Sequence, residues 1–248
     1  MLKSPNITTE AMTIYIIVPF RAGQDLDEET ATMRRAQLEK FVPYMRKFLP
    51  NAVIVIAEQV DDQRKFNRGK LLNAAFQRLG PRQNDQVIFH DVDLLPDDNL
   101  RYAYLGSEDA MHIARVWKDR YDSDSYLGGI LRLRADLFIY CNGYPNQYWG
   151  WGGEDNELRD RIATAHVQIH VPSRGGHITD MENKNLQEKL DHLKRHGLKC
   201  GNAWELRDEY RAKRRNGCYV EGLRDCNAYC IHEGVSMHGM CVRFLFDV

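Results

Sequence analysis

The segment QVIFHDVD, residues 86–93, joins a short apolar strand to an acidic end. Its first part, Gln86–Phe89, carries β-branched and aromatic residues and is predicted to be a buried strand. Asp91 and Asp93 follow directly, two residues apart. In an extended chain both side chains leave on the same face. We therefore expect both at the carboxyl edge of a sheet, where ligands bind in open α/β folds.

Two carboxylates at such an edge can together bind a metal ion. They suit a hard divalent cation, and a divalent cation in turn suits a diphosphate. The alternative is a polar turn in which an aspartate caps the chain. The pattern alone leaves both interpretations open.

The chain before this segment alternates between strand and helix. Strands are predicted at Ile14–Phe20 and Ala52–Ala57, and helices at Thr30–Leu49 and Phe66–Phe76. The first helix is strained by Pro43. Alternation of this kind predicts a parallel sheet with helices on both faces, which is a nucleotide-binding architecture.

The chain after it is mixed. We expect strands at Met111–Trp117, Gly129–Leu133, Val167–Val171 and Cys241–Asp247, and helices at Glu154–Ala163, Glu182–His196 and Trp204–Arg215. The last helix ends in a basic run that is interpreted as a solvated helix end. No repeat, low-complexity tract or linker divides the chain.

Composition excludes several classes of protein. The 248 residues carry a formal net charge of -1, with 28% charged and 43% hydrophobic residues, which is an ordinary globular balance. The near-zero charge predicts no nucleic-acid partner. The longest apolar runs are too short to span a bilayer, so no membrane segment is expected. No signal-peptide core follows Met1.

The chain has six cysteines, and five of them lie in its last fifth. Six are too few for a disulfide-dense scaffold in a chain of this length. Cys226 and Cys230 with His232 suggest a metal knot, but their spacing fits no standard zinc pattern. Structural cysteines, reduced or paired, are the preferred interpretation, and the sequence does not choose between these two states.

The segment WGWGGED, residues 149–155, is the most specific motif. Its two tryptophans supply flat faces that pack against sugar rings. Its glycines let the backbone approach a ligand closely. A carboxylate beside such a platform can accept a proton from a sugar hydroxyl. The alternative is a tryptophan-rich turn with an acidic helix start.

Four motifs, in this order, resemble those of the β-1,4-galactosyltransferase family, whose members are inverting enzymes with the GT-A fold. They are PFR at 19–21, FNRGKLLN at 66–73, HDVDLLP at 90–96 and WGWGGED at 149–155. YLGGIL at 126–131 and CNG at 141–143 are most similar to the branch that galactosylates xylose on proteoglycan core proteins. The resemblance implies an α/β fold with a single Rossmann-like mixed sheet and flanking helices.

The resemblance assigns a large set of residues to the nucleotide sugar. The implied donor-binding residues are Pro19, Phe20, Arg21, Phe66, Arg68, Lys70, Asp91, Val92, Tyr126, Trp151 and Gly153. Tyr126 matches a tyrosine whose bulk favours galactose over an N-acetylated sugar. Arg21 and Arg68 can pair with phosphate, and a surface salt bridge is the alternative for each.

The family binds Mn²⁺, and the implied metal ligands here are Asp93 and His177. The family's further ligand falls at Arg174 or Thr179 in this chain, which leaves that ligand unassigned. The stretch from about 173 to 196 corresponds to a loop that closes over the bound donor, with Gly175 and Gly176 as hinges.

The resemblance also implies the catalytic roles. Asp155 would act as the general base, and Glu154 would hold the donor galactose. The implied acceptor-binding residues are Trp151, Gly152, Asp155 and Asn156. Asn156 stands where the family usually has an aspartate, and an amide both donates and accepts hydrogen bonds.

We therefore expect one glycosyltransferase domain over 1–248, with a nucleotide-binding half at 14–100 and an acceptor-binding half with the tail at 101–248. Its partners would be UDP-galactose, UDP and a saccharide or glycoconjugate acceptor, and the product a β-1,4 galactoside of xylose or a similar sugar. The alternatives are an N-acetylhexosaminyltransferase of the same fold and a non-catalytic UDP-sugar-binding relative. A catalytic domain cut from an anchored protein would lie in the Golgi lumen; otherwise a soluble, cytoplasmic enzyme is expected.

Overall fold

A computed structural model describes residues 11–22, 28–117, 126–182, 184–218, 220–237 and 239–248. The predicted early elements are present. They are β1 (Ile14–Phe20), α1 (Glu28–Phe48), β2 (Val53–Gln59), α2 (Arg68–Leu79) and β3 (Gln86–His90). Further along lie β4 (Leu94–Pro96), α3 (Arg101–Leu105), β5 (Ala110–His112), β6 (Ile130–Arg134), α4 (Ala135–Tyr140), α5 (Glu154–Thr164), β7 (Ile178–Asp180), α6 (Leu186–Arg195), α7 (Ala203–Arg215), β8 (Tyr229–Ser236) and β9 (Cys241–Asp247).

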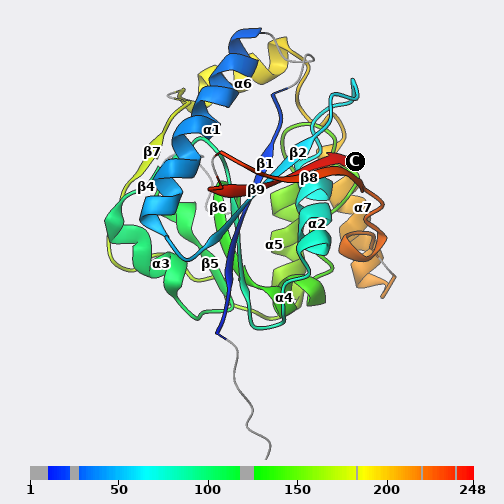
Figure 1. Ribbon diagram of the computed structural model, residues 1–248. Coiled ribbons are helices and arrows are strands. Elements are labelled where there is room, and N and C mark those ends of the chain that lie inside the picture. The colour runs from blue at the N-terminus through cyan, green and yellow to red at the C-terminus, as the bar shows by residue number, and fades with distance from the viewer. Residues whose placement is uncertain (1–10, 23–27, 118–125, 183, 219, 238) are drawn as a thin grey trace, which may run out of the picture.

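One seven-stranded sheet organises these elements, in the order β5-β6-β3-β1-β2-β9-β8. The central strands β3, β1, β2 and β9 run parallel. The outer strands β6, β5 and β8 pair antiparallel with their neighbours. The sheet is therefore mixed, and strands from both ends of the sequence meet within it (Figure 1).

Helices cover both faces of the sheet, as predicted. On one face α1 buries Leu38, Phe41 and Met45 against β1 and β2. On the other face α2, α4 and α5 pack together against the same strands (Figure 1). The helix α2 is held at both ends: the Asn67 side chain accepts from the Lys70 amide, and Gly80 closes the helix at a φ of 59°.

Several sequence predictions are corrected. The strand predicted at Met111–Trp117 is only three residues long, because the chain turns into a 3₁₀ helix at Ile113–Val116. Val167–Val171 forms no strand and pairs only through an isolated bridge at His170. The helix expected from Glu182 begins at Leu186, after Asn185 forms a capping box with Glu188. The strand β8 was not predicted.

The basic end of α7 was interpreted as solvated, and that interpretation is wrong for part of the run. Arg211 contacts Asp160 at 2.8 Å, and Arg214 pairs with the fully buried Glu157. Both acids lie on α5. The basic residues therefore fasten α7 to α5.

All six cysteines are free thiols. Cys226, Cys230 and His232 form no metal group: within the described residues, no three His, Cys, Asp or Glu side chains gather closely enough to hold an ion unaided. No helix among the described residues is long and apolar enough to cross a bilayer.

Candidate active site

Arg68 joins three parts of the predicted site. It is the first residue of α2, and its guanidinium contacts Asp91 Oδ1 at 3.0 Å, just beyond β3. The same guanidinium lies 3.6 Å from Glu154 Oε1, at the start of α5. Burial alone would lower the pKa of Arg68, but the Asp91 and Glu154 carboxylates raise it above its usual value. The chain thus gathers two acidic motifs around one cation.

Glu154 is the most perturbed acid of this group. Its residue is 8% exposed, and Oε2 has no hydrogen-bond partner within the described part of the chain. Burial, followed by the negative charge of Asp155, raises the pKa of Glu154 to about 7. Such an unpaired, buried oxygen is available to a hydroxyl donor of a ligand.

A narrow cleft runs beside these acids. It is lined by Asp91, Asp93, Leu94, Ala114, Trp117, Tyr126, Gly128, Gly129 and Lys189. Asp155 borders the same cleft, because a Cβ built on Gly128 would stand 3.0 Å from Asp155 Oδ2. The Tyr126 hydroxyl donates to the Ala114 carbonyl at 2.9 Å, which fixes the ring at the cleft wall. The structure thus brings Asp91, Asp93, Tyr126 and Asp155 together.

Asp93 contacts a cation that the sequence did not indicate. Its Oδ2 lies 3.5 Å from Nη1 of Arg34, on α1. Nη2 of the same guanidinium lies 3.8 Å from Oε1 of Glu182, which Lys189 contacts at 2.9 Å. Arg34 therefore stands between two carboxylates at the place where a metal ion is predicted.

His177 does not lie beside Asp93. In the β4–β7 pair, Leu94 is opposite Asp180, and the Met181 amide donates to the Asp93 carbonyl at 2.8 Å. The His177 carbonyl instead accepts from the Asp97 amide, at the other end of the pair, and its side chain is exposed. The structure does not assemble the two implied metal ligands.

The donor set nevertheless fits a hard divalent cation. Asp91 and Asp93 line one cleft, and carboxylate oxygens are the ligands that such cations prefer. Small divalent cations often take only one or two carboxylates from the protein and their other ligands from phosphates and water.

The backbone of the WGWGGED segment is fastened on both sides. The Gly150 amide donates to the Phe66 carbonyl at 2.8 Å, and the Trp151 amide donates to the Leu198 carbonyl at 2.8 Å. The Trp151 side chain remains 39% exposed. Gly152 and Gly153 have φ angles of 104° and 105°, which side chains rarely adopt. They turn the chain into α5, where Asp155 Oδ1 accepts from the Asn156 amide.

The remaining predicted donor-binding residues include four that are buried and Lys70, which is half-buried. Pro19, Phe20 and Val92 are buried in the core, where they shape the sheet edge. Arg21 is also buried, and its guanidinium donates to the Arg64 carbonyl at 2.6 Å in the loop after β2. Lys70 lies beside Cys226, and no ion pair of Lys70 is found among the described residues.

Sequence reasoning missed Arg34, Lys189 and Trp117. Trp117 and Lys189 line the cleft, and Arg34 contacts Asp93. These residues come from α1, α6 and the 3₁₀ turn after β5. No local motif marks them, because only the packing of distant elements brings them to Asp93.

Two family models match the chain. One describes the N-terminal region of glycosyl transferase group 7 and matches residues 3–105. The other describes the N-terminal domain of galactosyltransferase and matches residues 108–184. Together they include the acidic pair after β3 and the start of α5.

Named relatives agree with these matches. Beta-1,4-galactosyltransferase 7 of Drosophila melanogaster is 37% identical over 197 residues, which are 77% of this chain and 57% of that protein. The Homo sapiens protein of the same name is 37% identical over 164 residues, 64% of this chain and 46% of that protein. The chain therefore spans about half the length of these relatives.

Solved structures extend the likeness over most of the chain. The catalytic domain of Drosophila β1,4-galactosyltransferase 7 in complex with xylobiose has a TM-score of 0.74 and 31% identity, covering 96% of this chain and 94% of that one. A mutant of the same enzyme, in complex with manganese, UDP-Gal and xylobiose, also has a TM-score of 0.74. The seven-stranded mixed sheet with flanking helices is the expected GT-A fold. The chain therefore belongs to the β-1,4-galactosyltransferase family, in the branch that includes β-1,4-galactosyltransferase 7.

Proposed function

We propose that this chain transfers galactose from UDP-galactose to a hydroxyl of a xylose-type acceptor, with Mn²⁺ as cofactor and a β-1,4 linkage in the product. One observation carries the proposal: Arg68 joins Asp91 of the cleft to Glu154, the neighbour of Asp155. The relatives' names and the manganese, UDP-Gal and xylobiose bound to one of them support the choice of donor, metal and acceptor.

Donor binding would use the cleft and its rim. Asp91 and Asp93 offer oxygen ligands, and Arg68 holds Asp91 in place. Bound Mn²⁺ would neutralise the charge that develops on the departing diphosphate. Tyr126, held against Ala114, would limit the space beside the donor sugar. Glu154 Oε2 would accept a hydrogen bond from a galactose hydroxyl.

Catalysis would rest on Asp155. The acceptor hydroxyl would give its proton to this carboxylate while its oxygen bonds to the anomeric carbon. The bond from that carbon to UDP would break on the opposite face, which inverts the anomeric configuration. The exposed ring of Trp151 would support the sugars, and Gly152, Gly153 and Asn156 would border them.

His177 stays a predicted metal ligand. It would reach Asp93 only if the segment that contains β7 moved, since the two residues lie at opposite ends of the β4–β7 pair. The loop closure expected over about 173–196 would supply such a movement.

A donor and acceptor panel tests the proposal. UDP release is measured with several UDP-sugars, with Mn²⁺ or chelator, and with a xyloside or N-acetylglucosamine as acceptor. We expect release to require UDP-galactose, Mn²⁺ and the xyloside. Asp155→Asn should lower kcat by about 10²- to 10⁴-fold and leave UDP binding intact.

Asp208→Asn is the matched control, because Asp208 is an aspartate of α7 whose side chain is 79% exposed. It should retain full activity. Tight UDP binding without acceptor-stimulated release would refute the transferase and favour a binding protein. Release from an N-acetylated donor would instead refute the choice of galactose.

A nucleotide sugar and a saccharide acceptor are the proposed partners. The lack of a nucleic-acid partner stays a prediction from the near-zero net charge. A location in the Golgi lumen stays a prediction from the family resemblance.

A further inference from the structure

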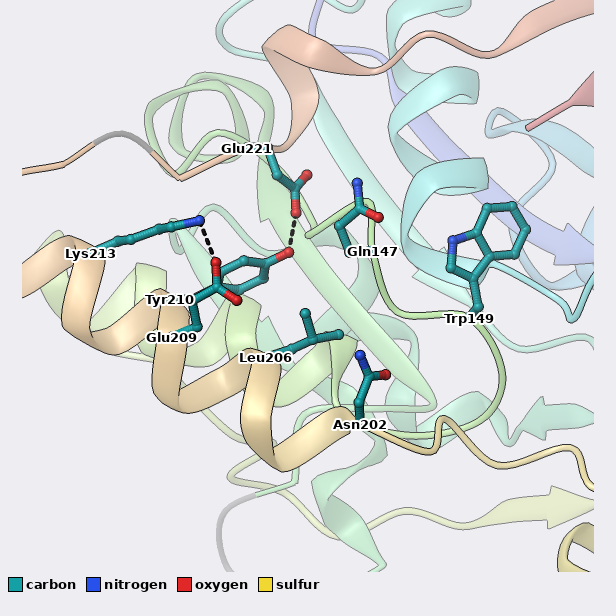
Figure 2. Close-up of a pocket in the computed structure, with 8 residues that line it drawn as sticks. All are labelled: Gln147, Trp149, Asn202, Leu206, Glu209, Tyr210, Lys213 and Glu221. Carbon is teal, nitrogen blue, oxygen red and sulfur yellow. Dashed lines mark hydrogen bonds and ion pairs between the residues drawn. The ribbon is translucent and has the colours of Figure 1, made fainter.

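A second cavity, of about 430 Å³, lies away from the acidic cleft, between α7 and the segment that leads into the WGWGGED motif (Figure 2). It is lined by Gln147, Trp149, Asn202, Leu206, Glu209, Tyr210, Lys213 and Glu221. None of these residues lines the cleft that holds Asp91 and Asp93. Its volume is within the range of about 300–1,000 Å³ that is usual for small-molecule sites.

Hydrogen bonds hold the α7 side of this cavity in place. The Tyr210 hydroxyl donates to Glu221, whose other oxygen accepts from the Asn146 amide at 2.9 Å. Helix α7 is fastened to α5 by Arg207, which contacts both oxygens of Asp160 at 3.1 Å. A ligand would therefore meet a preformed surface, which reduces the entropy cost of binding.

Three side chains offer hydrogen bonds that the protein does not use. Among the described residues, the Gln147 amide and the Trp149 indole nitrogen have no hydrogen-bond partner. The Asn202 amide group accepts only a weak bond from Cys200 Sγ, at 3.5 Å. Figure 2 shows the nitrogen edge of the indole turned toward Gln147. Exposed amides beside an unpaired indole N–H are suited to the hydroxyl groups of a sugar.

The charges of the lining exclude other ligand classes. Among the described residues that line the cavity, Lys213 is the one cation, and it pairs with Glu209 at 2.6 Å. Both oxygens of Glu221 already accept hydrogen bonds, so no carboxylate cluster is left for a metal ion. An anion would meet two carboxylates, one paired ammonium group and the Arg64 guanidinium over Trp149, which already pairs with Asp62 and Asp247. A purely apolar ligand would bury the amides of Gln147 and Asn202 without partners, at a cost in free energy.

We propose that this cavity is a second saccharide site, which binds a neutral pyranose unit independently of the donor and the metal ion. The indole N–H of Trp149 and the side-chain amides of Gln147 and Asn202 would bond its hydroxyls, since the Arg64 guanidinium already lies over the Trp149 ring, 5.0 Å from its centroid. Trp149 and Trp151 are two residues apart, so a glycan held here would stay close to the transferase site.

The four tryptophans allow a direct test, since each indole N–H gives its own NMR signal. The ¹⁵N-labelled protein is titrated with methyl β-xyloside, methyl β-galactoside and methyl β-glucuronide, in chelator and without UDP. Substituting Trp149 and Trp151 by phenylalanine, one at a time, assigns the two signals. Because no donor or metal is present, the result does not depend on the transferase proposal.

We expect a neutral glycoside to shift the Trp149 signal, also in Trp151→Phe. The pair Gln147→Ala with Asn202→Ala should weaken this binding about tenfold or more, because two hydrogen bonds are lost. Asn216→Ala is the matched control, since Asn216 is exposed at the other end of α7. Its affinity should equal that of the unchanged protein.

Three results would overturn the proposal. The first is a glycoside that shifts only the Trp151 signal. The second is equal or tighter binding of the glucuronide, which would mark an anion site. The third is an affinity at Trp149 that the double substitution leaves unchanged.

Discussion

Glu154 is the residue whose folded environment should be visible in the pH dependence of stability. Its pKa is raised from 4.5 to about 7 by burial and by Asp155. The unfolded chain gives up this proton at lower pH, so the contribution to stability is complete below pH 4.5 and is lost as pH rises through 7. As the pH rises through this range, we expect the unfolding free energy of the metal-free protein to fall by up to about 3 kcal/mol because of this group.

Urea denaturation between pH 4.5 and 8 measures this effect. Glu154→Gln should make the dependence shallower, because its amide does not ionise. Glu205→Gln, at an exposed position on α7, is the control and should follow the unchanged protein. Parallel curves for Glu154→Gln and the unchanged protein would contradict the prediction.

Arg34 should compete with a divalent cation for Asp93. Burial alone would lower the pKa of Arg34, but the carboxylates of Asp93 and Glu182 raise it above its usual value. Replacing it by methionine removes a unit charge that would repel the ion at short range. We expect Arg34→Met to bind Mn²⁺ about tenfold more tightly in the absence of nucleotide.

Electron paramagnetic resonance of free Mn²⁺ gives this affinity directly. Arg35→Met is the matched control, because Arg35 contacts the Ala22 carbonyl and not Asp93. Weaker binding by Arg34→Met than by Arg35→Met would show that Arg34 supports the metal site instead of competing with it.

At the scale of residues, the sequence predicted chemistry better than geometry. Asp91 and Asp93 were expected on one face of an extended strand, yet β3 ends at His90 and both aspartates lie in the turn that follows. They still line one cleft, because the turn directs both toward the sheet edge. A short motif predicts which side chains are near one another, whereas their orientation depends on the surrounding packing.

The element that most clearly depends on buried charge is α7. Arg214 pairs with Glu157, which is fully buried on α5 and also contacts Arg161 at 3.0 Å. Breaking such a pair leaves a buried charge undercompensated. We expect Arg214→Ala to lower the unfolding free energy by about 1–3 kcal/mol.

Thermal and urea denaturation of two neighbouring variants tests this pair. Arg215 is exposed, so Arg215→Ala should change stability by no more than about 0.5 kcal/mol. Equal stability of the two variants would mean that α7 is held to α5 by other contacts.

Elements with strong local signals were predicted and the others were not. The apolar run of β1 and the periodic pattern of α2 gave nearly correct bounds. The strand β8 was not predicted, because its side chains are mostly exposed and its register shifts between Cys230 and His232. It is a strand because β9 offers it a partner, and pairing of this kind leaves little trace in a local sequence.

For the whole molecule, the insertion of the C-terminal strand is decisive. β9 lies between β2 and β8, and it buries Phe244 and Phe246 against the side of the sheet that α2 covers. Phe244→Ala should lower the unfolding free energy by about 3–5 kcal/mol, because a large side chain leaves a cavity. Urea denaturation followed by both fluorescence and circular dichroism measures this loss.

Tyr229→Ala is the control on the neighbouring strand, where the side chain is 74% exposed. It should change stability by no more than about 0.5 kcal/mol. A small effect of Phe244→Ala would mean that the tail contributes little to the sheet. Coincident transitions by both probes would support the proposed single domain over 1–248.

The sequence by itself determined the parts that depend on local order. Hydrophobic periodicity set most of the strands and helices, and four short motifs predicted the family and the residue types around the cleft. The tertiary structure alone decided the long-range partners: Arg34 beside Asp93, Arg214 beside Glu157, and β9 between β2 and β8. The physical reason is that periodicity and turn chemistry act over a few residues, whereas ion pairs and strand order depend on how distant surfaces pack.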